Sequence, residues 1–141
     1  MARDPGPALS FETAFLTVRQ PDAENIDANG HVNNVVYLEW AQEIAIAHWL
    51  ACADSALVET CRFVVRQHLI DYRAPIFETD TVEVRTWLGK LGGARMNRHT
   101  DIRVAGASAP SASAVTQWCL VDATGQRPKR IEASILNAFG L

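Results

Sequence analysis

Apolar residues recur along the chain with two different periods, and the change of period separates the predicted elements. Over residues 34–52 the apolar positions return every three or four residues, which is typical of an amphipathic helix. Asn33 or Asn34 is a suitable N-cap, because a side-chain oxygen there accepts a hydrogen bond from an unpaired backbone N–H. The polar stripe of this helix is narrow: Glu39, Gln42 and Glu43. We therefore expect other structure to cover most of the helix.

A period of two residues, typical of strands with one buried face, occupies most of the remaining chain. It predicts five strands: 10–19, 62–73, 80–89, 96–104 and 113–122. Gly89, Gly92 and Gly93 predict a turn between the third and fourth strands, residues 122–125 predict another, and residues 131–139 predict a short helix. One strand, a long helix and four closely spaced strands predict an α+β fold, with an antiparallel sheet around a central helix.

The length of 141 residues fits one domain, which we place at 10–141 after a flexible lead-in at 1–9. A net charge of −3 argues against a protein that binds nucleic acid or an anionic membrane. The three cysteines are widely spaced and odd in number, so we interpret them as reduced thiols. The start of the chain lacks the apolar segment of a signal peptide, and no apolar run is long enough to span a bilayer. These features predict a soluble cytoplasmic protein.

Several common catalytic motifs are absent or imperfect. The stretch GASAP at 106–110 lacks the final glycine of a G-x-S-x-G nucleophile elbow and stands between two predicted strands. The stretch GKLGG at 89–93 matches neither a phosphate-binding loop nor a dinucleotide fingerprint. No HExxH or comparable metal-ligand spacing occurs, so we expect neither a metal site nor a bound cofactor.

The loop directly before the long helix concentrates hydrogen-bonding groups in the stretch DANGHVNN, residues 27–34. One interpretation is that these residues only form turns and cap the helix. The other is that they form a catalytic site. Asp27 supplies a carboxylate, Gly30 permits close approach of the backbone to a ligand, and the free N–H groups near Asn34 favour a developing negative charge. A carboxylate and an oxyanion donor are the two parts that hydrolysis of an activated acyl group requires.

The string DANGHVNNVVYLEW resembles the signature of hotdog-fold acyl thioesterases of the 4-hydroxybenzoyl-CoA thioesterase branch, and its first part resembles the plant acyl-carrier-protein thioesterases. IDYRAPIFETDTVEVRTWLGKLG at 70–92 and VDATGQRPKRI at 121–131 are similar to later strands of the family. The resemblance covers about residues 10–139. It implies a hotdog fold, hydrolysis of an acyl-CoA to a free acid and coenzyme A, and a homodimer or homotetramer with its active site at the subunit boundary.

The resemblance also implies roles for individual residues. Asp27 matches the catalytic carboxylate, as general base or nucleophile, and the backbone N–H of Asn34 matches the group that polarises the thioester carbonyl. Asn29 and His31 match positions that the plant enzymes use in catalysis. The candidate substrate contacts beside them are Gly30, Val32, Asn33 and Tyr37. Basic residues near the region where relatives hold the coenzyme A phosphates are Lys90, Arg95 and Arg98.

Three alternatives remain open to experiment. The chain could hydrolyse acyl-carrier-protein thioesters in place of acyl-CoA, or bind an acyl thioester as a sensing module without turning it over. A hotdog dehydratase is a third candidate, but the sequence lacks the histidine expected in an H-x-x-P-type loop. The sequence does not specify the length of the acyl group or whether it is aliphatic or aromatic.

Overall fold

The computed structural model describes residues 7–141, which form one sheet and three α-helices. A 3₁₀ turn at Ala23–Asn25 precedes the long helix. The elements in chain order are β1 (Phe15–Arg19), α1 (Asn34–Cys52), α2 (Ser55–Thr60), β2 (Arg62–Tyr72), β3 (Val82–Gly92), β4 (Arg95–Val104), β5 (Ala112–Val121) and α3 (Ala133–Ala138). No helix within residues 7–141 is both long and apolar enough to cross a lipid bilayer.

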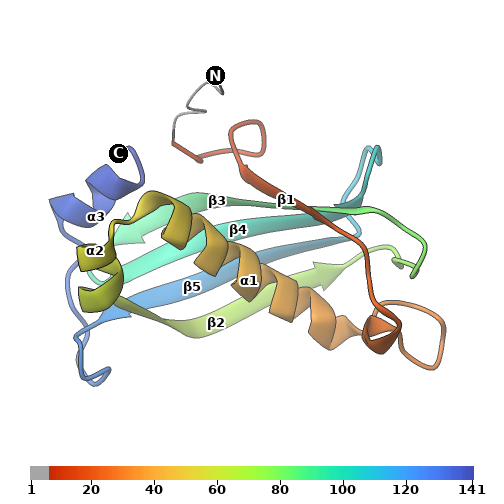
Figure 1. Ribbon diagram of the computed structural model, residues 1–141, viewed down its shortest axis with the longest axis horizontal. Helices are drawn as coiled ribbons and strands as arrows, with labels where there is room; N and C mark the ends of the chain where they lie inside the picture. The colour runs from red at the N-terminus through yellow and green to blue at the C-terminus, as the bar shows by residue number, and fades with distance from the viewer. Residues whose placement is uncertain (1–6) are drawn as a thin grey trace.

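The five strands form one antiparallel sheet in the order β1-β3-β4-β5-β2. Strands β3, β4 and β5 follow one another directly, whereas β2 adds to the outer side of β5 and β1 to the outer side of β3. The long helix α1 lies across one face of this sheet (Figure 1). The α+β hotdog arrangement expected from the sequence is confirmed.

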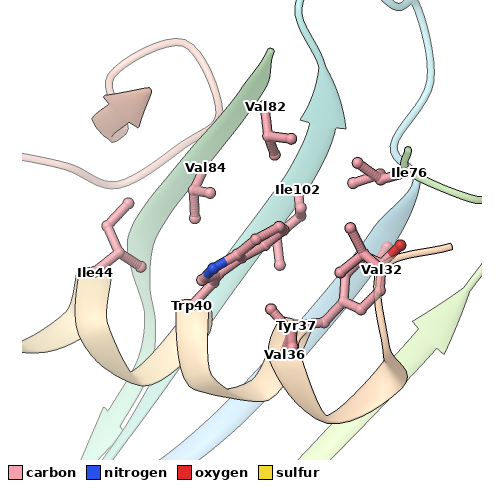
Figure 2. Packing of buried hydrophobic residues seen from close by; sticks show 10 residues of the cluster. Val32, Val36, Tyr37, Trp40, Ile44, Ile76, Val82, Val84 and Ile102 are labelled. Carbon is pink, nitrogen blue, oxygen red and sulfur yellow. The ribbon is translucent and has the colours of Figure 1, made fainter. Parts of the chain in front are cut away.

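The core lies between α1 and the sheet, because alternate strand residues point toward the helix. Figure 2 shows the half of the core at the start of α1, where Tyr37, Trp40 and Ile44 face Val84 and Ile102. All five side chains are buried. This packing holds the first turns of α1 in one position relative to the sheet.

The outward face of α1 carries exposed apolar side chains, in agreement with its narrow polar stripe. We expected other structure to cover most of the helix, but the side chains of Val35, Ile46 and Leu50 are 59%, 52% and 55% exposed in the chain. They stand beside the exposed Glu39 and Glu43. Within residues 7–141 of one chain the sheet covers only one side of α1, so cover for the other side would have to come from a second copy.

The first strand begins later than the period of two predicted. Strand β1 starts at Phe15, whereas we placed its start at residue 10. Residues 10–13 form a local turn, in which Thr13 Oγ1 accepts hydrogen bonds from the backbone N–H groups of Leu9 and Ser10. A side chain that binds nearby backbone offers the chain an alternative to the sheet ladder.

Two later segments add to or correct the sequence analysis. Gly89 lies inside β3 rather than in a turn, and the β3–β4 turn is formed at Gly93. Residues 53–61, for which the sequence analysis named no element, contain the helix α2, which Asp54 caps by accepting a hydrogen bond from Leu57 N–H. The short helix predicted near the end of the chain is confirmed as α3.

The flexible lead-in predicted over residues 1–9 lies partly outside the described residues, which begin at residue 7. The part that is described does not behave as a free lead-in. Ala8 is 6% exposed, and its carbonyl accepts a hydrogen bond from Leu88 N–H at 2.9 Å. Ala8 is therefore held against β3, while the neighbouring Leu9 is exposed.

Candidate active site

The loop that leads into α1 closes on itself through backbone hydrogen bonds. Ile26 and Val32 form an antiparallel bridge, and Asp27 N–H donates to the carbonyl of His31 at 2.8 Å. Gly30 N–H donates to the carbonyl of Asp27 at 3.1 Å. The φ angle of Gly30 is +79°, in the left-handed region that favours glycine, so the tight turn depends on this residue.

The loop holds the Asp27 carboxylate in one orientation. Its Oδ1 atom accepts hydrogen bonds from the backbone N–H groups of Asn29, at 2.9 Å, and His31, at 3.2 Å. Within residues 7–141 no hydrogen bond uses Oδ2. The side chain is half-buried, so the second oxygen remains available to a water molecule or a substrate atom.

The start of α1 offers an unpaired donor beside this carboxylate. Asn33 is the N-cap, and its side-chain oxygen accepts from Val35 N–H at 3.2 Å. Asn34 is the first helical residue, and within the described part of the chain its N–H donates to no acceptor. Such N–H groups at a helix start carry a partial positive charge and favour a bound or developing anion.

A groove with a volume of about 340 Å³ joins these two features. Asp27 lies in its wall together with Asn34, so the carboxylate and the start of the helix face the same space. The remaining wall residues come from the loop, from α1 and from the end of β2: Asn29, His31, Val32, Tyr37, Tyr72, Arg73, Ala74 and Pro75.

Two tyrosines connect the groove to the core. Tyr37 is buried, and its ring meets the ring of Tyr72 edge-to-face at 5.3 Å between centroids. Burial raises the pKa of Tyr37, a backbone hydrogen bond with Ile76 acts in the opposite direction, and the neighbouring Tyr72 and Asp27 raise it further. Burial also raises the pKa of Tyr72. Both phenols are therefore neutral donors at neutral pH, close to the charge of Asp27.

The structure brings most of the sequence-predicted site residues together. Asn29, His31, Val32 and Tyr37 line the groove with Asp27 and Asn34. His31 reaches Asp27 through its backbone, while its ring packs edge-to-face on Phe77 at 5.2 Å. Gly30 shapes the turn and Asn33 caps the helix, and neither belongs to the wall of the groove.

The wall residues 72–75 escaped the sequence analysis. Tyr72 ends β2, 45 residues after Asp27, Arg73 follows it, and only the sheet order brings β2 alongside the start of α1. Their own segment carries a period of two that points only to strand structure. The resemblance of residues 70–92 to the family was the one signal near them.

The basic residues predicted near the coenzyme A phosphates lie elsewhere in this chain. Lys90 and Arg95 flank the β3–β4 turn at one end of the sheet. The helix α1, whose first residues line the groove, begins at the other end (Figure 1). Lys90 is eight residues beyond the start of β3, which places it roughly 25 Å along the strand from the end of β3 where Val82 lies. Arg98, the third of these residues, is buried: it is 2% exposed, and its side chain meets His48 on α1.

The other histidines have structural partners. His48 is a core histidine, and its Nδ1 lies 2.8 Å from Arg98 Nη1. His68 Nδ1 lies 2.8 Å from Thr116 Oγ1, and the His99 ring stacks on Trp87 at 5.5 Å. None of the three lines the groove.

Comparison with known proteins gives one family and a consistent fold. A sequence model of the thioesterase-like superfamily matches residues 21–139. No curated protein matches the chain.

Solved structures share the fold at low sequence identity. A thioesterase from Thermus thermophilus, complexed with coenzyme A and zinc, is 22% identical, with a TM-score of 0.77 over 88% of this chain and 90% of that one. A probable thioesterase from Escherichia coli is 23% identical, with a TM-score of 0.78 over 89% and 96%. A 1,4-dihydroxy-2-naphthoyl-CoA thioesterase from Synechocystis is 17% identical, with a TM-score of 0.77 over 89% and 95%.

Proposed function

The chain belongs to the thioesterase-like superfamily and is a thioester hydrolase, and on that premise we propose that it hydrolyses an acyl-CoA at the groove before α1. One observation carries this proposal. The Asp27 carboxylate and the unpaired Asn34 N–H line one groove that is open to solvent. The coenzyme A bound to the Thermus thermophilus protein, and the acyl-CoA substrate of the Synechocystis protein, support coenzyme A as the thiol part of the substrate.

The two groups would divide the chemistry between them. As a general base, Asp27 removes a proton from a water molecule, whose oxygen attacks the thioester carbonyl carbon. The carbonyl oxygen gains negative charge and accepts a hydrogen bond from Asn34 N–H. The C–S bond then breaks, and the leaving coenzyme A thiolate takes up the proton that Asp27 had removed from water. As a nucleophile, Asp27 would attack the same carbon directly, the C–S bond would break with release of the coenzyme A thiolate, and water would hydrolyse the resulting anhydride to the free acid and regenerate Asp27.

Substitution of the carboxylate tests the proposal. Asp27→Asn keeps the shape of the side chain but removes its basicity, so turnover should fall at least 100-fold while the melting temperature changes little. Glu24→Gln is the matched control, because it removes one exposed negative charge from the same loop. Free-thiol detection across a panel of aliphatic and aromatic acyl-CoAs measures both variants. Near-wild-type hydrolysis by Asp27→Asn would refute the mechanism.

The edge of the sheet beside the groove supports a homodimer, alone or paired into a homotetramer. Among residues 7–141, strand β2 pairs only with β5, so its other side is an open edge. Leu69 on this strand is 66% exposed and Val64 is 42% exposed. An open, apolar edge of this kind is usually covered. Two copies related by a two-fold axis would pair β2 antiparallel, which places the start of one β2 beside the groove end of the other.

The mass in solution tests the dimer. Leu69→Lys places a charge on the β2 edge and should convert the wild-type dimer or tetramer to a smaller species in light scattering after size exclusion. Val18→Lys is the matched control, because Val18 is 59% exposed on β1, the opposite edge of the sheet. A monomeric wild type, or equal responses of the two variants, would refute assembly through β2.

A further inference from the structure

A second cavity lies at the opposite end of α1 from the groove. Its volume is about 240 Å³, and it is open to solvent between the second half of α1 and the sheet. Its walls are mostly apolar and aromatic, with Trp49 from α1, Phe63 from β2 and Phe139 after α3. It shares no residue with the groove of Asp27. The cavity is therefore a separate site within the chain.

One wall of this cavity carries a buried guanidinium group. Arg98 on β4 is 2% exposed. Its Nη1 lies 2.8 Å from His48 Nδ1 and donates to Thr86 Oγ1 at 3.3 Å. Its Nε is buried and has no hydrogen-bond acceptor. Trp118 lines the same cavity, and its indole Nε1 is likewise buried without an acceptor.

The charge of Arg98 has no acidic partner among residues 7–141, where the ion pairs involve other residues. Burial lowers the pKa of Arg98 to about 10, with the nearby Cys52 acting in the opposite direction, so the guanidinium remains charged at neutral pH. Burial, aided by Arg98, lowers the pKa of His48 to about 4, so His48 is neutral and its Nδ1 accepts from Arg98. Leaving a buried charge uncompensated is costly, and such groups often mark functional sites.

We propose that this cavity binds the carboxylate of a small apolar acid, with the carboxylate accepting a hydrogen bond from Arg98 Nε–H and the apolar part packing on Trp49, Phe63 and Phe139. A carboxylate supplies both the missing charge and the missing acceptor, and charge-assisted hydrogen bonds of this type are strong. Trp118, whose buried indole N–H also lacks an acceptor within the described residues, lines the same cavity. A volume below the roughly 300–1,000 Å³ of drug-sized sites limits the ligand to a small acid.

The acid has two possible sources. It is either a free carboxylic acid, or the distal carboxylate of the acyl group of a thioester. The second source rests on the proposed function and on pairing through β2, because the cavity wall at Phe63 and the groove wall at Tyr72 stand at opposite ends of that strand. Antiparallel pairing would place the cavity of one copy beside the groove of the other.

A binding experiment with matched probes tests the site itself. Octanoate and 1-octanol have the same chain and differ in charge, and their binding is followed by calorimetry and by tryptophan fluorescence. The wild type should bind octanoate at least tenfold more tightly than octanol. Arg98→Met should lose this preference while still binding octanol. Arg127→Met, which removes an exposed positive charge, should keep the preference.

Arg98→Lys is a second variant for the case in which Arg98→Met does not fold. It retains a positive charge at this position but lacks the Nε–H of arginine. It should show an intermediate preference. Equal binding of the two probes by the wild type would overturn the proposal, since water would then be sufficient to satisfy Arg98. An unchanged preference in both folded Arg98 variants would overturn it as well.

Turnover distinguishes the two sources. If the acid is the distal end of an acyl group, the wild type should hydrolyse the monothioester of octanedioic acid with a kcat/KM at least tenfold above that of octanoyl-CoA. Arg98→Met should reduce this ratio and Arg127→Met should keep it. A ratio near one, together with octanoate binding, assigns the site to free acids. If neither thioester is hydrolysed, the proposed acyl-CoA activity fails for these substrates, while the binding experiment still decides the site.

Discussion

Tyr72, the last residue of β2, donates its hydroxyl hydrogen to the backbone carbonyl of Asn34 at 2.9 Å. This bond ties the open edge of the sheet to the first residue of α1, although 38 residues separate the two. The ring of Tyr72 also meets that of Tyr37. The position of the Asn34 N–H in the groove therefore depends on β2 as well as on the loop before the helix.

Removal of this one hydroxyl tests its positioning role. Tyr72→Phe keeps the ring contact with Tyr37 and removes the hydrogen bond, which typically contributes about 1 kcal/mol. We expect kcat for acyl-CoA hydrolysis to fall several-fold, because the oxyanion donor is held less firmly, and the melting temperature to fall by only a few degrees. The measurement is steady-state kinetics beside thermal unfolding. Unchanged kinetics in a folded variant would show that the bond serves stability alone.

Gly30→Ala tests whether the left-handed turn sets the carboxylate. An added Cβ would contact nothing within 4 Å, so the effect arises from the φ of +79° alone. Strain of this kind costs about 1–2 kcal/mol. Turnover should fall roughly tenfold, because Asn29 and His31 N–H would shift away from Asp27.

The chain offers a matched control for this substitution. Gly125, in the turn after β5, has a φ of +75° and also has nothing within 4 Å of an added Cβ. Gly125→Ala should cost a similar free energy of unfolding, measured in denaturant, and leave turnover unchanged. Equal losses of turnover in the two variants would mean that strain acts through global stability.

The sequence predicted the elements whose signal is local. The helix α1 and most strand positions follow from the period of apolar residues, and the loop at 27–34 follows from its turn residues and its place before a helix. The start of β1 was misplaced because the Thr13 hydroxyl binds local backbone, which the period of two does not reveal.

Features that depend on sheet order could not be predicted in this way. Arg98 was placed near the coenzyme A phosphates by the resemblance, whereas its side chain is buried against His48 of α1. Tyr72 and Arg73 reach the groove only because β2 pairs with β5 and lies at the sheet edge. Long-range pairing of this kind leaves no short motif in the sequence.

Gly89→Ala should destabilise the sheet because of a close contact. An added Cβ would lie 2.6 Å from His99 Nε2 and 2.9 Å from its Cδ2, and the stacking of His99 on Trp87 restricts the movement of that ring. Overpacking of this type typically costs about 1–3 kcal/mol. Gly92→Ala, at the end of the same strand, is the control, because its added Cβ would contact nothing within 4 Å. Equal denaturant midpoints for the two variants would contradict the prediction.

Stability should fall as the pH drops below the ordinary pKa of histidine, because His48 is buried in its neutral form. Burial lowers its pKa from 6.5 to about 4, so between these values the unfolded chain binds a proton that the folded chain does not. Above pH 6.5 the neutral His48 does not reduce the free energy of unfolding. Between pH 6.5 and 4 the free energy of unfolding falls progressively, by at most about 3 kcal/mol in total.

Denaturant unfolding from pH 7.5 to 4 measures this dependence. His48→Gln should flatten the slope of unfolding free energy against pH in the window between 6.5 and 4. Burial also lowers the pKa of His68, which is less enclosed, so His68→Gln should remove a smaller part of the same slope. If His48→Gln had the wild-type slope, the histidine would not be held neutral by the fold.

The oxyanion donor itself can be removed, because it belongs to the first residue of a helix. Asn34→Pro deletes the N–H, and proline is well tolerated at this position, where no intrahelical hydrogen bond is lost. The preceding residue must be extended, and Asn33 already has φ −61° and ψ 138°. We expect kcat to fall about 100- to 1,000-fold, with a change in unfolding free energy below about 1 kcal/mol. Asn34→Ala, which keeps the N–H and removes the side chain, should lose far less. If the proline variant hydrolyses acyl-CoA as well as the alanine variant does, then the start of α1 is not the oxyanion donor.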